Sequence, residues 1–257
     1  MTSPYFEAGG ITLWHGDALA VLAAMPAASV DAVITDPPYS SGGAFRADRA
    51  QATGKKYVRT NAIRQGVDFH GDNRDQRAYG YWCALWMAEA LRVTRPGGVF
   101  CTFTDWRQLP ATSDAVQAGG WVWRGVVPWL KPSARPAGAN RFTNQCEYVV
   151  WGSAGRMPLD YSGGWVRGFF QANVPRDREH QTQKPLDVMR ELMAVVPQGG
   201  TVCDPFMGSG TTGVAAVIEG HRFVGVEQHA HYIDVARDRI AAAVDGTPPG
   251  SGQGVLL

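Results

Sequence analysis

Short apolar runs alternate along the chain with stretches in which apolar residues recur every three or four positions. The runs predict β-strands at Ile11–Trp14, Val30–Thr35, Val99–Thr104, Trp121–Trp129, Glu147–Trp151, Thr201–Cys203 and Arg222–Glu227. The helical spacing predicts helices at Ala18–Met25, Tyr79–Val93, Leu186–Val196, Gly210–Glu219 and Tyr232–Val244. Because helices separate most of these strands, the pattern indicates an α/β fold.

Three segments without this periodicity interrupt the predicted elements. They cover residues 40–78, 131–141 and 152–179, and the first holds eight Lys or Arg residues against four Asp residues. Long irregular segments inside a compact domain usually carry a function or are disordered. We therefore expect a single domain over residues 1–244 with these three segments as recognition insertions. The Gly- and Pro-rich stretch 245–257 is expected to be a flexible tail.

Composition sets wide limits. A chain of 257 residues with 45% hydrophobic residues can form one substantial core. The formal net charge of +1 neither requires nor excludes a nucleic-acid partner. Four scattered cysteines without a Cys-x-x-Cys pair predict reduced thiols and no metal site. Since neither a signal peptide nor a long apolar stretch is apparent, we expect a soluble cytoplasmic protein without a membrane partner.

Two motifs follow predicted strands and are the main chemical signal. Asp36-Pro37-Pro38-Tyr39 comes directly after the run that ends at Thr35, and Asp204-Pro205-Phe206-Met207-Gly208-Ser209-Gly210-Thr211-Thr212 comes after Cys203. Ligands of open α/β sheets bind at the carboxyl edge of the strands. If both strands belong to one parallel sheet, the motifs meet there and form a site for two substrates.

The second motif is typical of a nucleoside cofactor site. Gly208 and Gly210 allow close approach of the backbone, and Glu227, at the end of the next strand, can accept hydrogen bonds from two ribose hydroxyls. A P-loop would need a Lys before the Ser or Thr, and here Gly210 leads directly into Thr211. A cofactor without phosphates, such as S-adenosylmethionine, therefore fits better. A plain βα turn with a helix cap is the alternative.

The first motif suits the activation of an aromatic amine, whose nitrogen lone pair is delocalised into the ring. The Asp36 carboxylate and the Pro37 carbonyl, held by consecutive prolines, can each accept one amino hydrogen and free the lone pair. Tyr39 can stack on a base that has left its duplex. A rigid surface turn is the alternative for this tetrapeptide alone.

In these residues the chain resembles the amino-group DNA methyltransferases of the β arrangement, in which the catalytic motif precedes the cofactor motif. The resemblance covers most of residues 11–244 and includes further matches in the same order. These are His15-Gly16-Asp17, Arg95-Pro96-Gly97-Gly98, Glu147-Tyr148-Val149-Val150-Trp151 and His180-Gln181-Thr182-Gln183-Lys184-Pro185. The family implies a Rossmann-like, seven-stranded, mostly parallel sheet with helices on both faces.

The resemblance also implies site residues and a cofactor, S-adenosylmethionine. The catalytic residues would be Asp36, Pro37, Pro38 and Tyr39. The cofactor pocket would be formed by Asp17, Asp36, His180, Thr182, Gln183, Lys184, Asp204, Pro205, Phe206, Gly208, Ser209, Gly210, Thr211, Thr212, Glu227 and Gln228. Asp17 would contact the adenine of the cofactor and Glu227 its ribose.

Double-stranded DNA is the implied substrate, and cations in the irregular segments are candidates for phosphate contacts. They are Arg46, Arg49, Lys55, Lys56, Arg59, Lys131, Arg135, Arg141 and Arg167, each of which could equally belong to a solvated surface. Trp129, Tyr161 and Trp165 are candidates for stacking on DNA, whereas Trp82, Trp86, Trp123 and Phe100 are expected in the core. The segment 152–179 is shorter than the recognition region usual in the family.

The resemblance favours adenine N6 as the acceptor, because Asp at position 36 is commoner among adenine enzymes of the family. Cytosine N4 uses the same chemistry and stays open, as does a catalytically silent cofactor- or DNA-binding subunit. Relatives of this kind occur in bacteria and phages, in the cytoplasm and at the nucleoid. The resemblance also makes a homodimer and a cognate restriction endonuclease candidate partners of this protein.

Overall fold

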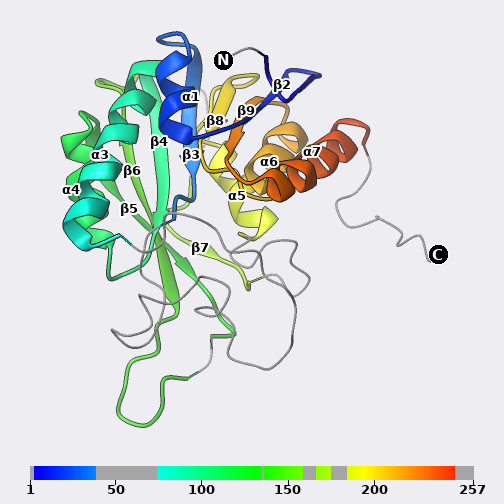
Figure 1. Ribbon diagram of the computed structural model, residues 1–257. Helices are drawn as coiled ribbons and strands as arrows, with labels where there is room; N and C mark the ends of the chain where they lie inside the picture. Colours follow the sequence, from blue (N-terminus) through cyan, green and yellow to red (C-terminus); the bar gives the residue numbers. More distant parts are fainter. Residues whose placement is uncertain (1–2, 39–73, 135, 159–165, 175–183, 247–257) are drawn as a thin grey trace.

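The computed structural model describes residues 3–38, 74–134, 136–158, 166–174 and 184–246 (Figure 1). Its strands are β1 Phe6–Ala8, β2 Ile11–His15, β3 Val30–Thr35, β4 Thr94–Thr104, β5 Val122–Leu130, β6 Cys146–Ser153, β7 Phe170–Gln171, β8 Thr201–Asp204 and β9 Arg222–Glu227. Its helices are α1 Ala18–Ala24, α3 Gln76–Val93, α4 Leu109–Ala118, α5 Leu186–Met193, α6 Thr211–Ile218 and α7 Ala230–Val244.

All strands of the described chain belong to one mixed sheet with the order β1-β2-β9-β8-β3-β4-β6-β5-β7. Strands β2, β9, β8, β3 and β4 are parallel, and β6 runs antiparallel to both of its neighbours. The predicted seven strands thus form the sheet from β2 to β5. The sequence did not predict β1 and β7, the short strands that extend its two edges, because three and two residues are too few for a visible periodicity.

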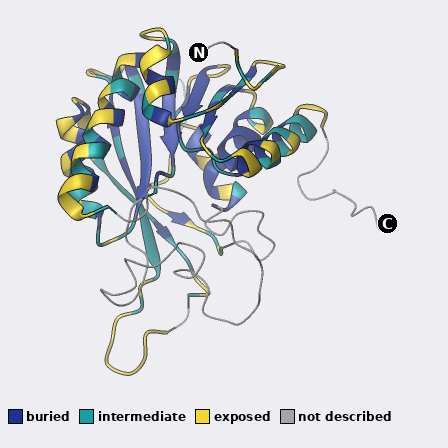
Figure 2. Cartoon of the chain, viewed as in Figure 1, coloured by how far each residue is buried: buried dark blue, intermediate teal, exposed yellow. Residues whose placement is uncertain are grey.

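Helices cover both faces of the sheet, as the alternation of apolar side chains along the strands requires (Figure 1). In β3, Ala32 and Ile34 pack in the cluster that includes residues of α5, α6 and α7, whereas Val30 and Val33 pack with α1 and α3. The central strands are buried on both faces, and the exposed residues gather on the outer sides of the helices (Figure 2).

After the adjacent strands β3 and β8, the chain continues into helices on opposite faces of the sheet. The next described helix after β3 is α3, which packs on the face covered by α1, whereas β8 leads into α6 on the opposite face. Neighbouring strands whose chains leave toward opposite faces open a crevice at the carboxyl edge. Asp36 and Asp204 lie at this edge, one after each strand.

Some predictions from the apolar pattern were wrong. Helix α4 was not predicted, because its sequence, LPATSDAVQA, mixes small and polar residues without a continuous apolar face. Trp123 was expected in the core but is 44% exposed; it lies at the start of β5, where β7, which pairs only with Trp129 and Leu130, does not cover the strand. Trp129, a candidate for DNA stacking, is buried and donates from Nε1 to the Ala172 carbonyl at 2.9 Å.

The predicted reduced thiols are confirmed: all four cysteines are free, and Cys83, Cys101 and Cys203 are buried. Burial raises the pKa of the Cys83 and Cys101 thiols to about 12, so neither is a reactive thiolate at neutral pH. Across the described elements, no helix combines the length and apolar character needed to cross a bilayer.

Candidate active site

Three acidic residues lie at the carboxyl edge of adjacent strands. Asp36 follows β3, Asp204 ends β8 and Glu227 ends β9. The parallel register aligns these strands, with Val33 opposite Cys203 and Asp204 opposite Gly225. The two motifs, far apart in the sequence, therefore meet at one edge, as their position after strands predicted.

Asp204 joins the two motifs through hydrogen bonds. Its Oδ1 accepts from the Thr35 hydroxyl at 2.6 Å and from the Phe206 backbone N–H at 3.0 Å, and its Oδ2 accepts from the Thr212 hydroxyl at 2.5 Å. Only 2% of the residue is exposed, and burial raises its pKa to about 6 despite these hydrogen bonds. Asp204 thus ties the end of β3 to the turn after β8 and to the first turn of α6.

The turn between β8 and α6 depends on glycine. Gly208 and Gly210 have φ of +52° and +81°, in the left-handed region that residues with a Cβ rarely adopt. A Cβ on Gly210 would lie 2.9 Å from that of Ala236, so the lack of a side chain also lets α7 approach. Arg239 of α7 donates to the carbonyl of Ser209 and, at 3.0 Å, to its hydroxyl oxygen.

Glu227 closes the turn from the next strand. Its Oε2 accepts from the Gly208 N–H at 3.0 Å and its Oε1 accepts from the His229 N–H at 2.7 Å. Burial raises the pKa of this carboxyl, and the backbone N–H groups act in the opposite direction. The carboxylate lies beside the turn, where it can accept from the hydroxyls of a bound ribose.

A pocket opens between the two motifs. Its lining combines Asp36 of the first motif, residues of the second motif, and two residues in or just before α5: Asp36, Lys184, Met189, Asp204, Phe206, Met207, Gly208, Ser209, Thr211 and Thr212. All of them except Met189 and Met207 were predicted as site residues from the sequence. Met207 belongs to the second motif itself, whereas Met189 lies within the predicted helix Leu186–Val196.

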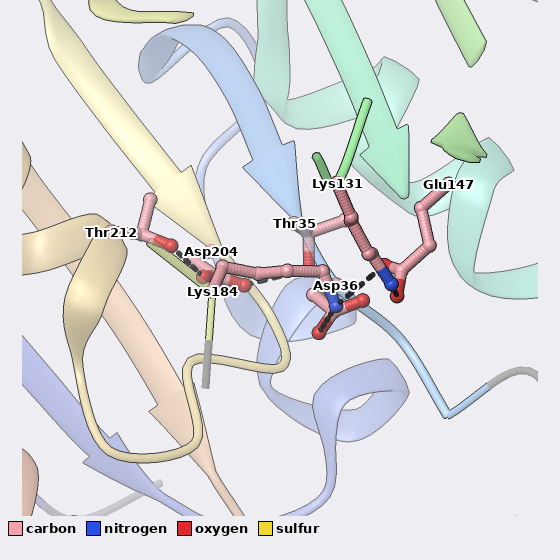
Figure 3. Close-up of polar contacts among 7 residues, drawn as sticks. All are labelled: Thr35, Asp36, Lys131, Glu147, Lys184, Asp204 and Thr212. Atoms are coloured by element: carbon pink, nitrogen blue, oxygen red, sulfur yellow. Dashed lines mark hydrogen bonds and ion pairs between the residues drawn. The ribbon is translucent and has the colours of Figure 1, made fainter. Parts of the chain in front are cut away.

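A chain of alternating charges ends at Asp36 (Figure 3). The Lys184 ammonium lies 2.5 Å from Asp36 Oδ2 and 3.4 Å from Glu147 Oε2. Glu147 Oε1 accepts from the Lys131 ammonium. Lys184 was expected to line the cofactor pocket; it lines the pocket between the two motifs, and its charged end contacts the Asp36 carboxylate.

The charge chain shifts the pKa of its members. Burial raises the pKa of Asp36, and the neighbouring Lys184 opposes this rise. Burial also acts to raise the pKa of Glu147, but Lys184 and Lys131 outweigh it and hold that pKa below its usual value. For Lys184, Asp36 and Glu147 outweigh burial and raise the pKa, so the ammonium stays protonated.

Asp36 keeps one acceptor atom available. Its Oδ1 is buried and has no hydrogen-bond partner among the residues that the structure describes, whereas Oδ2 is bound by Lys184. A buried carboxylate oxygen without a partner costs free energy on the order of 1–3 kcal/mol. Such an atom at the wall of a pocket is a place for a donor from a substrate.

Other predicted site residues do not line this pocket or lie outside the described chain. Asp17 caps α1 by accepting from the Ala20 N–H at 3.0 Å, and Gln228 is exposed after β9. Pro37 and Pro205 are buried and Pro38 is half-buried. The predicted residues outside the described ranges are Tyr39, Arg46, Arg49, Lys55, Lys56, Arg59, Arg135, Tyr161, Trp165, His180, Thr182 and Gln183.

Among the predicted DNA-binding cations, Arg141 and Arg167 are exposed, whereas Lys131 is directed toward Glu147 and only 21% of its side chain is accessible. DNA contact by Lys131 stays a prediction; in the structure its ammonium forms an ion pair with Glu147. The sequence analysis also missed Thr35 and Arg239, because neither stands in a motif and each acts through the tertiary structure.

Comparison with known proteins agrees with this arrangement. The chain matches the N6/N4 family described as DNA methylase over residues 30–238. Type II methyltransferase M2.DpnII from Streptococcus pneumoniae is 26% identical over 261 residues, which cover 94% of either chain.

Two solved structures share the fold. The M1.HpyAVI–SAM complex is 22% identical with a TM-score of 0.63 and covers 90% of this chain and 98% of its own. PvuII DNA methyltransferase, described as cytosine-N4-specific, is 17% identical with a TM-score of 0.65 and covers 95% of this chain and 94% of its own.

The family match includes Asp36, the glycine turn and Glu227, which the sheet brings to one edge. It spans well over half of the chain. The chain therefore belongs to the DNA methylase family of enzymes that methylate the exocyclic amino groups of adenine at N6 or cytosine at N4.

Proposed function

We propose that this protein is a site-specific DNA methyltransferase that moves a methyl group from S-adenosylmethionine to N6 of an adenine flipped out of its duplex. One observation carries the proposal: Asp36 Oδ1 is buried and has no hydrogen-bond partner within the described chain. Asp36 lines the same pocket as the glycine turn. The aspartate at this position also favours adenine.

The residues of the pocket fit S-adenosylmethionine. Apart from Gly208 and its two chain neighbours, no heavy atom of the described residues lies within 4 Å of the place that a Cβ would take on Gly208, so the turn has open space on that side. Glu227 can hold the ribose, and the absence of Lys and Arg from positions 204–212 suits a cofactor without phosphates. When bound, the cofactor supplies an electrophilic methyl group on a positively charged sulfur.

The protein orients the amino group of the target base and makes its nitrogen more nucleophilic. Asp36 Oδ1 and the Pro37 carbonyl accept the two amino hydrogens, so the nitrogen becomes pyramidal and its lone pair is directed at the methyl carbon. The N–C bond forms as the C–S bond breaks, and the electron pair of that bond stays on sulfur. The nitrogen then releases one proton to Asp36 or to water. Positioning and electrostatics account for most of such an acceleration.

Cytosine N4 is the second candidate acceptor. The likeness in fold to the cytosine-N4-specific PvuII enzyme favours it, and the arrangement of two acceptors around one amino group is the same for both bases. Aspartate at position 36 leads us to place adenine first.

The partners follow from the same proposal. Double-stranded DNA is the substrate, with the exposed Arg141 and Arg167 as candidates for contacts to its phosphates. The Type II name of the relative M2.DpnII supports a cognate restriction endonuclease for this protein. A homodimer and a location in the bacterial cytoplasm are part of the proposal.

The test is direct analysis of methylated DNA. The purified protein is incubated with S-adenosylmethionine and unmethylated genomic DNA, and the DNA is digested to nucleosides for mass spectrometry. We expect N6-methyladenine. N4-methylcytosine would select the second candidate, and DNA without either nucleoside would overturn the proposal.

A further inference from the structure

Glu147 is a buried carboxylate that the proposed chemistry does not use. It lies in β6 opposite Trp129 of β5, and 16% of its side chain is exposed. Burial of a carboxylate is costly unless charged or hydrogen-bonding partners compensate it. The partners of Glu147 show what it does for the site.

Both partners of Glu147 are ammonium groups. Its Oε1 accepts from Lys131, which follows β5 and whose backbone N–H donates to the Gln145 carbonyl at 2.8 Å across the hairpin. Its Oε2 lies 3.4 Å from the Lys184 ammonium and has no hydrogen-bond partner among the described residues. Glu147 therefore has one oxygen fixed to its own hairpin and the other directed at Lys184 (Figure 3).

Lys184 needs this second contact. A lysine side chain is a flexible stem that carries a point charge, so a single contact with Asp36 leaves its direction poorly defined. Only 6% of the side chain is exposed. The ammonium lies 5.1 Å from the centre of the Phe103 ring and between the carboxylates of Asp36 and Glu147. Two opposite charges on two different elements fix its position.

Asp36 receives its orientation from Lys184. Because the two oxygens of a carboxylate are rigidly linked, binding of Oδ2 by the ammonium at 2.5 Å determines the direction of Oδ1. Oδ1 is the oxygen left for the target amine. A displacement of about 1 Å at a reacting group can lower the rate about 100-fold.

We propose that Glu147 is a positioning residue that holds the Lys184 ammonium on Asp36 Oδ2 and thereby aims Asp36 Oδ1 at the target amino group. The inference rests on the proposed function, because it assigns Glu147 a part in the same methyl transfer. In this inference the β5–β6 hairpin, through Lys131 and Glu147, holds the Lys184 ammonium that orients Asp36.

A purely structural ion pair would behave differently. Its loss would lower stability and the amount of folded protein, with no selective effect on kcat. A positioning residue affects kcat while the KM values for cofactor and DNA stay nearly constant, since substrate binding does not need the correct direction of Oδ1.

The experiment compares Glu147→Gln, which removes the charge and keeps the shape, with the wild-type protein. Glu219→Gln is the control, because it breaks the more exposed Arg190–Glu219 ion pair, which includes no member of the charge chain and no residue that lines the pocket. We expect Glu147→Gln to lower kcat about 10- to 100-fold and to leave both KM values within about threefold. Glu147→Asp keeps the charge and should retain more activity, and Glu219→Gln should match the wild type.

A double-mutant cycle tests whether Glu147 acts through Lys184. In a Lys184→Met background there is no ammonium to hold, so Glu147→Gln should change kcat less than about twofold. Equal factors in both backgrounds would overturn the inference, as would an unchanged kcat in the single variant. If Glu147→Gln does not fold, the same cycle with Glu147→Asp decides. Absence of methyl transfer by the wild-type protein would instead contradict the proposed function.

Discussion

The hydrogen bond between Thr35 and Asp204 gives the sharpest test of how the two motifs are joined. Thr35→Val keeps the shape of the side chain but removes the hydroxyl that donates to Asp204 Oδ1 at 2.6 Å. Thr102 is its register partner on β4, and both residues are fully buried. Within the described chain, the Thr102 hydroxyl has no hydrogen-bond partner. The same substitution at the two positions therefore differs mainly in one hydrogen bond.

The expected magnitudes follow from the charge on Asp204. At pH 8, above its pKa of about 6, the Thr35 hydroxyl donates to a carboxylate, and losing such a bond costs about 1.5–3 kcal/mol of unfolding free energy. At pH 5 the carboxyl is mostly protonated, and the cost should fall to about 0.5–1.5 kcal/mol. Thr102→Val removes an unsatisfied hydroxyl and should change stability by about zero or slightly in the stabilising direction.

The assay is denaturant unfolding of the wild-type protein and both variants at pH 5 and pH 8, followed by circular dichroism. Equal losses for Thr35→Val and Thr102→Val would refute the reasoning, since the hydrogen bond to Asp204 would then contribute nothing. A loss at Thr35 that does not depend on pH would show that Asp204 is not the relevant partner.

Two further predictions concern the same turn. Between its ordinary pKa of 3.8 and its raised value of about 6, folded Asp204 holds a proton that the unfolded chain lacks, so its contribution to stability falls as pH rises. Asp204→Asn, which does not titrate there, should thus gain about 2 kcal/mol of unfolding free energy relative to the wild type between pH 4 and pH 6; parallel pH profiles would contradict this. Gly210→Ala, which is strained at φ +81° and crowded by Ala236, should lower the free energy of unfolding by about 2–5 kcal/mol. Gly208→Ala, at φ +52° in open space, should lower it by about 1–2 kcal/mol. Equal shifts of the two variants in thermal unfolding would contradict the packing argument.

The local patterns were sufficient to predict the central strands and most helices, whereas the seven-stranded sheet with helices on both faces was predicted from the family resemblance. Val30–Thr35 and Arg222–Glu227 were predicted with the bounds that the structure shows, because each contains a short run without charged residues that is bounded by polar residues. Helix α4 and the edge strands β1 and β7 depend on tertiary contacts that a local pattern does not reveal. The short edge strands of the sheet were therefore less predictable than its central strands.

The site was predictable wherever its residues stand in motifs. Asp36, Asp204 and the glycine turn meet at one edge because parallel strands deliver their carboxyl ends to the same place. The charge chain from Lys131 to Asp36 was not predictable, since its four members come from separate segments and are paired only in the folded protein. Lys131 illustrates the difference: its sequence context suggested DNA contact, and the structure directs it to Glu147.

The central claim is that Asp36 performs the chemistry beside a separate cofactor turn, and one comparison tests it most directly. Transfer of a labelled methyl group to unmethylated DNA is measured for the wild-type protein and for Asp36→Ala, together with calorimetric binding of S-adenosylmethionine. We predict that turnover falls at least about 100-fold while the Kd for the cofactor stays within about threefold. An Asp36→Ala variant with turnover close to that of the wild type would contradict the account.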